Sequence, residues 1–140
     1  MLKEYIDQGF GIREDLNCAE QILHGANDVY QLGLDKKCLQ LAGGFGGGMA
    51  VEDACGVVTG ACMVFSAVYI EERARVTPEL KPVISEYIRR FEQELGTINC
   101  ARLKDRHCRE PEFCRPIISK GAEILDQVLQ EHNKMHNKKV

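Results

Sequence analysis

The chain has 140 residues and a formal net charge of −3, so it is long enough for one domain with a buried core and has no excess positive charge to attract nucleic acid. It has no tryptophan and only 6% aromatic residues, which argues against the stacking surfaces that bind single-stranded nucleic acid. Its first residues are charged where a secretory signal would be apolar, so we expect a cytoplasmic protein.

Helix signals follow one another from the N-terminal end. Asp15 or Asn17 can cap a helix whose apolar residues repeat at helical spacing until Gly33 ends it. A second, shorter helix starts at Asp35 and runs into residues 43–49, the glycine-rich segment "GGFGGGM". This segment lacks the lysine and hydroxyl residue of a phosphate-binding loop, so we interpret it as a turn that allows close approach of the backbone.

The third and longest predicted helix covers about residues 52–75 and contains an uncharged stretch at residues 54–70. This stretch is at the lower limit of length for a membrane span, but its many small residues make it only modestly hydrophobic. We therefore expect a central buried helix and no association with a membrane. Gly56 and Gly60 are four residues apart, which lets another helix approach closely. Any exposed part of this glycine stripe would suit a homodimer.

Two more helices complete the chain. Thr77 can cap the fourth helix, with Pro78 in its first turn and Gly96 as its stop. The last helix starts at Pro116, after a cysteine-rich segment. No segment alternates apolar and polar residues as a half-buried strand would. The sequence thus predicts an all-α fold, a single domain of residues 1–140 with about five helices in one bundle.

Four of the seven cysteines stand at predicted helix starts. The tripeptide Asn-Cys-Ala occurs twice, and Asn17 or Asn99 as the cap would put the cysteine in the first turn. A third cysteine follows the glycine-rich turn, and a fourth precedes Pro116. These four are Cys18, Cys55, Cys100 and Cys114. The helix dipole and the unpaired amides at a helix start favour the thiolate, so we expect lowered pKa values for these thiols.

Cations surround the last two of these cysteines. One lysine and several arginines lie within a few residues of them: Arg102, Lys104, Arg106, Arg109 and Arg115. If they face the thiols, they would lower the thiol pKa further. In a cytoplasmic protein, such cysteines are more often redox groups or metal ligands than a disulfide framework.

Five segments together resemble the family of redox-active proteins labelled C_GCAxxG_C_C: "NCAEQIL", "GGFGGGM", "ACGVVTGACM", "LGTINCARL" and "CRPIISKGAEIL". The resemblance covers most of the chain. It implies a small helical protein whose spaced cysteines carry redox or iron–sulfur chemistry. The family's cysteines map onto Cys18, Cys55, Cys100 and Cys114, which leaves Cys38, Cys62 and Cys108 outside the motif.

Three functional hypotheses follow. The first is a redox protein, a thiol-dependent oxidoreductase, whose four motif cysteines cycle between dithiol and disulfide with an unidentified redox partner. The second is a module that holds an iron–sulfur cluster or another metal on the same four thiolates, although their spacings match no ferredoxin or zinc-knuckle pattern. The third is a helical interaction protein with inert core cysteines. The first two require the four cysteines to converge in the fold.

Overall fold

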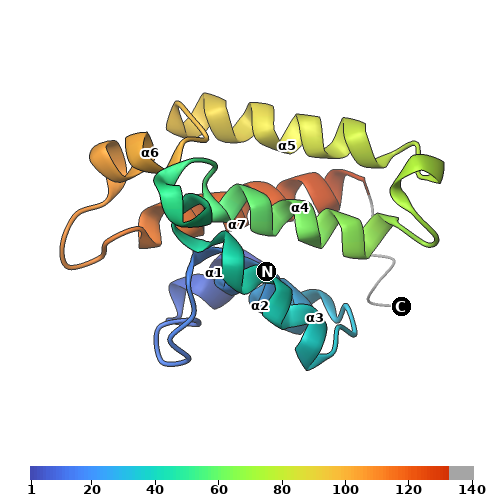
Figure 1. The fold of residues 1–140 in the computed structure, drawn as a ribbon, viewed down its shortest axis with the longest axis horizontal. Coiled ribbons are helices and arrows are strands. Elements are labelled where there is room, and N and C mark those ends of the chain that lie inside the picture. Colours follow the sequence, from blue (N-terminus) through green and yellow to red (C-terminus); the bar gives the residue numbers. More distant parts are fainter. Residues whose placement is uncertain (133–140) are drawn as a thin grey trace.

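The structure is a computed structural model that describes residues 1–132, and it is built from helices joined by short turns (Figure 1). Seven α-helices form in these residues: α1 (Leu2–Asp7), α2 (Cys18–Tyr30), α3 (Lys36–Gln40), α4 (Gly56–Tyr69), α5 (Leu80–Leu95), α6 (Cys100–His107) and α7 (Arg115–Glu131). Short 3₁₀ turns cover Leu41–Phe45 and Ala74–Val76. Between residues 1 and 132 the chain forms no β-strand, only two isolated bridges, so the all-α prediction is confirmed.

The number of helices differs from the prediction of about five. The six-residue α1 is too short to show a helical repeat of apolar residues. The eight-residue α6 lies inside the cysteine-rich segment, where the sequence predicted only a first turn after Asn99. Both helices are too short to be stable alone, and packing against the rest of the bundle is what maintains them.

Local caps place most helix starts where the sequence predicts them. The Asn17 side chain accepts a hydrogen bond of 2.9 Å from the Glu20 amide, and Glu20 Oε1 accepts one from the Asn17 amide, which completes a capping box. Asp35 caps α3 through the Cys38 amide, and Asn99 caps α6 in the same way.

Three predicted boundaries are wrong. The helix α2 ends at Tyr30, because Gln31 adopts the left-handed conformation before Gly33 is reached. The helix α4 starts only at Gly56, because residues 47–50 form a left-handed turn with φ between 62° and 66°. Glu52 and Asp53 therefore precede this helix instead of lying in its first turn. At its other end, α4 stops at Tyr69, where the next residue is extended.

The start of α5 also differs from the prediction. Glu79, not Thr77, is the capping residue, and α5 begins at Leu80. The Thr77 hydroxyl instead donates a hydrogen bond of 2.8 Å to the Arg73 carbonyl across the preceding 3₁₀ turn. The predicted stop is confirmed, since Gly96 ends the helix with φ of 94°.

The helix α4 is the buried centre of the bundle, as predicted, and packs against α2, α5 and α7 (Figure 1). Its glycine stripe faces α2: a Cβ atom on Gly60 would lie 2.9 Å from the Ala19 carbonyl oxygen and 3.1 Å from Ile22 Cβ. Since α2 covers this stripe, the stripe is not the surface for a homodimer. No helix of residues 1–132 is both long and apolar enough to cross a membrane.

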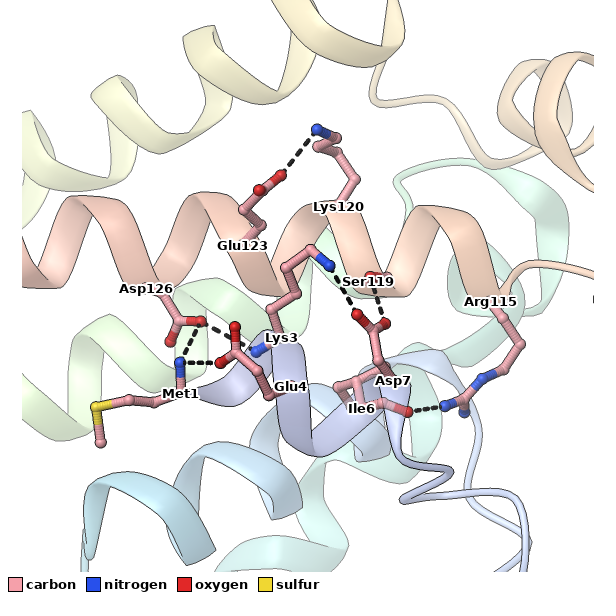
Figure 2. Close-up of polar contacts among 10 residues, drawn as sticks. All are labelled: Met1, Lys3, Glu4, Ile6, Asp7, Arg115, Ser119, Lys120, Glu123 and Asp126. Atoms are coloured by element: carbon pink, nitrogen blue, oxygen red, sulfur yellow. Dashed lines mark hydrogen bonds and ion pairs between the residues drawn. The ribbon is translucent and has the colours of Figure 1, made fainter.

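The helices α1 and α7 are joined by a buried carboxylate (Figure 2). Asp126 of α7 is only 7% exposed and accepts hydrogen bonds from the amides of Leu2 and Lys3, each 3.0 Å long. It also accepts a bond of 3.1 Å from the Met1 amino group and one of 2.6 Å from the Tyr30 hydroxyl. A side chain of α7 thus satisfies the free amides at the start of α1.

Candidate functional site

A cavity of about 470 Å³ opens where the N-terminal ends of four helices meet. The helices α2, α4, α6 and α7 each bring to its wall the cysteine at their start: Cys18, Cys55, Cys100 and Cys114. These four residues are distant in the sequence, so the bundle and not local structure brings them together.

Backbone hydrogen bonds align the start of α4 with the start of α6. The Cys55 amide donates to the Ile98 carbonyl at 2.8 Å, and the Cys100 amide donates to the Asp53 carbonyl at 2.5 Å. An antiparallel bridge pairs Ala54 with Asn99 between them. The two cysteines are therefore held on adjoining parts of the wall by main-chain bonds.

Two glycines make room for the thiols. Gly56 lies against Cys18 Sγ so closely that a Cβ atom there would overlap the sulfur. Gly48, in the left-handed turn, faces Cys100, where an added Cβ would lie 2.7 Å from Cys100 Cβ. Gly48 also has φ of 63°, which a residue with a side chain adopts only at a cost. The predicted role of the glycine-rich segment, close approach of the backbone, is confirmed at this position.

The fourth cysteine is not a free thiol. Cys114 forms a disulfide with Cys108, and their Cα atoms are 4.7 Å apart. The bond closes the loop of residues 109–113, part of which also lines the cavity. Cys108 stands outside the family motif, so the sequence analysis missed this partner. Its spacing of six residues from Cys114, with Pro111 between, is a signal that could have identified a closed loop.

The predicted lowering of thiol pKa is wrong for two of the four cysteines. Burial raises the pKa of Cys55 to about 12, although the amides of Val57 and Val58 at the start of α4 act in the opposite direction. Burial also raises the pKa of Cys100, against a smaller effect of the Lys104 charge. Cys55 is 6% exposed and Cys100 is 8% exposed, whereas Cys18 is half-buried. Desolvation at the cavity wall therefore outweighs the helix start.

The predicted cationic setting is also largely absent at the thiols. Arg115 lines the cavity, but its guanidinium is bonded to main-chain carbonyls: it donates to Ile6 of α1, as Figure 2 shows, and to Phe10. Arg109 donates to the carbonyls of Asp105 and Cys108. Lys104 does line the cavity, where it forms an ion pair of 2.8 Å with Glu52.

Two of the five free cysteines do not belong to the cavity wall. Cys38 is exposed on α3, and its pKa is raised by the side chain of Asp35. Cys62 is half-buried in the middle of α4, and burial raises its pKa. The Ser66 hydroxyl, one turn after Cys62, donates a hydrogen bond of 2.9 Å to the Cys62 carbonyl and so is bonded within its own helix.

A four-thiolate metal or cluster site does not fit this arrangement. Within residues 1–132, no group of three or more His, Cys, Asp or Glu side chains is placed to hold a metal ion. Cys114 is bonded to Cys108, so the four thiolates of such a site are not available together in this disulfide form.

Comparison with known proteins identifies a family. Searches of curated proteins and of solved structures found no match. The family model described as "Putative redox-active protein (C_GCAxxG_C_C)" matches residues 16–128, a range that includes every cysteine of the cavity wall and Cys108. The chain therefore belongs to the C_GCAxxG_C_C family.

Proposed function

We propose that this protein is a thiol–disulfide oxidoreductase in which Cys18 and Cys55 exchange electrons with the Cys108–Cys114 disulfide, with Cys100 as a further thiol of the cavity wall. The observation that carries the proposal is the composition of the wall: three free thiols share one cavity with a disulfide. A disulfide and a nearby thiol are the two reactants of thiol–disulfide exchange.

Accessibility favours Cys18 as the attacking group. A thiol must ionise to attack a disulfide, and burial keeps the Cys55 and Cys100 thiols protonated at neutral pH. Cys18 is the more exposed thiol of the three and lies at the start of α2. Gly56, the neighbour of Cys55, contacts the Cys18 sulfur, which makes Cys55 the candidate for the second thiol.

The exchange has two steps. In the first, the Cys18 thiolate attacks Cys114 Sγ, a Cys18–Cys114 disulfide forms, and the bond to Cys108 breaks, so Cys108 leaves as a thiolate. In the second, Cys55 passes its proton through water to the Cys108 thiolate released in the first step and attacks Cys18 Sγ, and Cys114 leaves as a thiolate. Two electrons have then moved from the Cys18 and Cys55 pair to the Cys108 and Cys114 pair, which can pass them to the disulfide of a redox partner.

Blocking one partner of the disulfide tests the first step. A Cys108→Ser variant leaves Cys114 with a free thiol, and oxidised glutathione would convert it to a mixed disulfide. We expect Cys18 to displace the glutathione and form a Cys18–Cys114 disulfide, which the second step converts to a Cys18–Cys55 disulfide; peptide mapping under non-reducing conditions detects both. The double variant Cys108→Ser, Cys18→Ser should keep glutathione on Cys114.

The matched control is Cys38→Ser in the Cys108→Ser background, because Cys38 is exposed and does not line the cavity. It should lose the glutathione and form the same disulfide-linked peptides of Cys18. Persistent glutathione on Cys114 with Cys18 present would show that the two sulfurs do not react, and would favour inert core cysteines.

A further inference from the structure

The cavity beside the thiols is walled mainly by hydrocarbon. Its apolar lining comes from the loop after α1, from α4, α6 and α7, and from the disulfide-closed loop: Ile12, Val57, Leu103, Phe113, Ile117 and Ile118. Its volume of about 470 Å³ is in the range of sites for small organic molecules. The helix starts that form it are parts of the packed bundle, so the site exists before any ligand binds.

The uncharged polar side chains of the wall are already bonded within the protein. Asn17 accepts from the Glu20 amide and donates to the Gly43 carbonyl at 3.0 Å. Gln21 donates to the Leu16 carbonyl and accepts from Arg115, each at 2.8 Å. Each amide group thus already has a donor and an acceptor atom engaged within the protein, so the polar side chains of the wall are positioned by the fold and not by a ligand.

The cations of the wall are also engaged. Lys104 is paired with Glu52, and Arg115 is bonded to Gln21 and to two carbonyls of the segment after Tyr5. The carboxylate of Glu112, a further lining residue, adds a negative charge. The wall therefore offers little to an anionic ligand.

Two exposed apolar side chains on the wall supply an independent observation. Ile12 is 63% exposed and Phe113 is 60% exposed, although both line the cavity. Phe113 has φ of 52°, an unusual conformation for a bulky residue, and its amide donates to the Arg109 carbonyl at 2.6 Å. An apolar molecule in the cavity would cover both side chains, and the area removed from water would favour its binding.

We propose that the cavity binds a small, uncharged and mainly apolar organic molecule, with the disulfide-closed loop of residues 109–113 as one wall. The proposal goes beyond the proposed function, which concerns the cavity thiols and the disulfide, and does not depend on it. Binding itself needs the apolar wall and not the thiols.

Two fluorescent probes with the same ring system test the preference for an uncharged ligand. N-phenyl-1-naphthylamine is neutral, and 1-anilinonaphthalene-8-sulfonate adds one negative charge to it. With the full chain in its disulfide form, we expect saturable binding of the neutral probe at one site and at least about tenfold weaker binding of the sulfonate. Absent binding of the neutral probe, or equal binding of the two, would overturn the proposal.

Variants locate the bound probe. Phe113→Asp should weaken binding of the neutral probe about tenfold by removing apolar wall and adding charge, and Asp tolerates a positive φ. Leu41→Asp is the matched control, because Leu41 is 69% exposed but lies outside the cavity, and it should leave binding unchanged. Equal effects of the two variants would overturn the assignment. Probe binding to the disulfide form needs no thiol exchange, so failure of the proposed function and failure of this proposal give different results.

Discussion

Two regions beside α7 accommodate buried polar groups in opposite ways: the surroundings of Asp126 and the cavity at the N-terminal end of the helix. In the C-terminal half of α7, the Asp126 carboxylate is 7% exposed and accepts four hydrogen bonds, of which Figure 2 draws those from Met1 and Lys3. At its N-terminal end, the buried thiols of Cys55 and Cys100 face an apolar cavity, and burial raises their pKa.

The difference follows from the chemistry of the two groups. A carboxylate is ionised near neutral pH, so burial requires hydrogen bonds that replace its water. A thiol is neutral there and packs as a small hydrophobe, so it needs no such network. The first arrangement stabilises the fold, while the second leaves a reactive atom beside empty space. The following predictions test this contrast, from the largest expected effect to the smallest.

Removing the carboxylate should cost the most stability. Asp126→Ala leaves the Leu2 amide and the Tyr30 hydroxyl buried without their acceptor, and we expect a loss of about 3 kcal/mol or more in the free energy of unfolding. Urea unfolding measures it. Asp7→Ala is the control, because Asp7 also joins α1 to α7, through Ser119, but is largely exposed and should cost about 0.5 kcal/mol. Equal losses would mean that the buried network contributes no more than a surface contact.

Overpacking the glycine stripe should cost somewhat less. In Gly60→Leu the new side chain meets the backbone of α2 at Ala19, so we expect a loss of about 2–3 kcal/mol. Thermal melting detects it. Gly44→Leu is matched, since Gly44 has no atom within 4 Å of an added Cβ, and its melting temperature should hardly change. An unchanged melting temperature for Gly60→Leu would contradict the close packing of α2 on α4.

The raised pKa of Cys55 should appear as a loss of stability at alkaline pH. Above about pH 9 the thiol ionises in the unfolded chain but stays protonated in the folded one, whose pKa is about 12. The unfolded state then binds fewer protons, so stability falls as pH rises from 9 to 12, by at most about 1.4 kcal/mol per pH unit. Below pH 9 this contribution is fully present.

Urea unfolding of the wild type and of Cys55→Ala between pH 7 and pH 10 isolates this contribution. Above pH 9 the variant should lose less free energy of unfolding than the wild type, because it lacks the Cys55 thiol while its other titrating groups are the same. Parallel curves for the two proteins would show that the thiol has the same pKa in the folded and unfolded states.

The smallest effect on stability is expected at the rim of the cavity. Lys104→Gln removes the ion pair with Glu52, which is exposed and worth about 0.5 kcal/mol or less. The same change should slow alkylation of Cys100 by iodoacetamide, because the Lys104 charge lowers the pKa of this thiol. Peptide mapping after a short pulse measures the rate, with exposed Cys38 as the internal reference. An unchanged rate at Cys100 would mean that the Lys104 charge has no effect on the pKa of this thiol.

Much of the fold could be predicted because helix starts are local. The caps at Asn17, Asp35 and Asn99 are bonds to an amide three residues ahead, so the side chain and its partner are both visible in the sequence. The late start of α4 could not be predicted in this way. It depends on a left-handed turn that includes Met49 and Ala50, residues with no preference for that conformation.

The sequence by itself determined that the chain is helical and that Cys18, Cys55, Cys100 and Cys114 stand at helix starts, because capping and periodicity act within a few residues. Only the tertiary structure decided that these starts meet at one cavity, that Cys114 pairs with Cys108, and that burial raises the pKa of Cys55 and Cys100. Desolvation depends on which distant segments cover a side chain, so it cannot be read from neighbouring residues. The spacing of Cys108 and Cys114 is compatible with a closed loop, but only the path of that loop brings the two sulfurs within bonding distance.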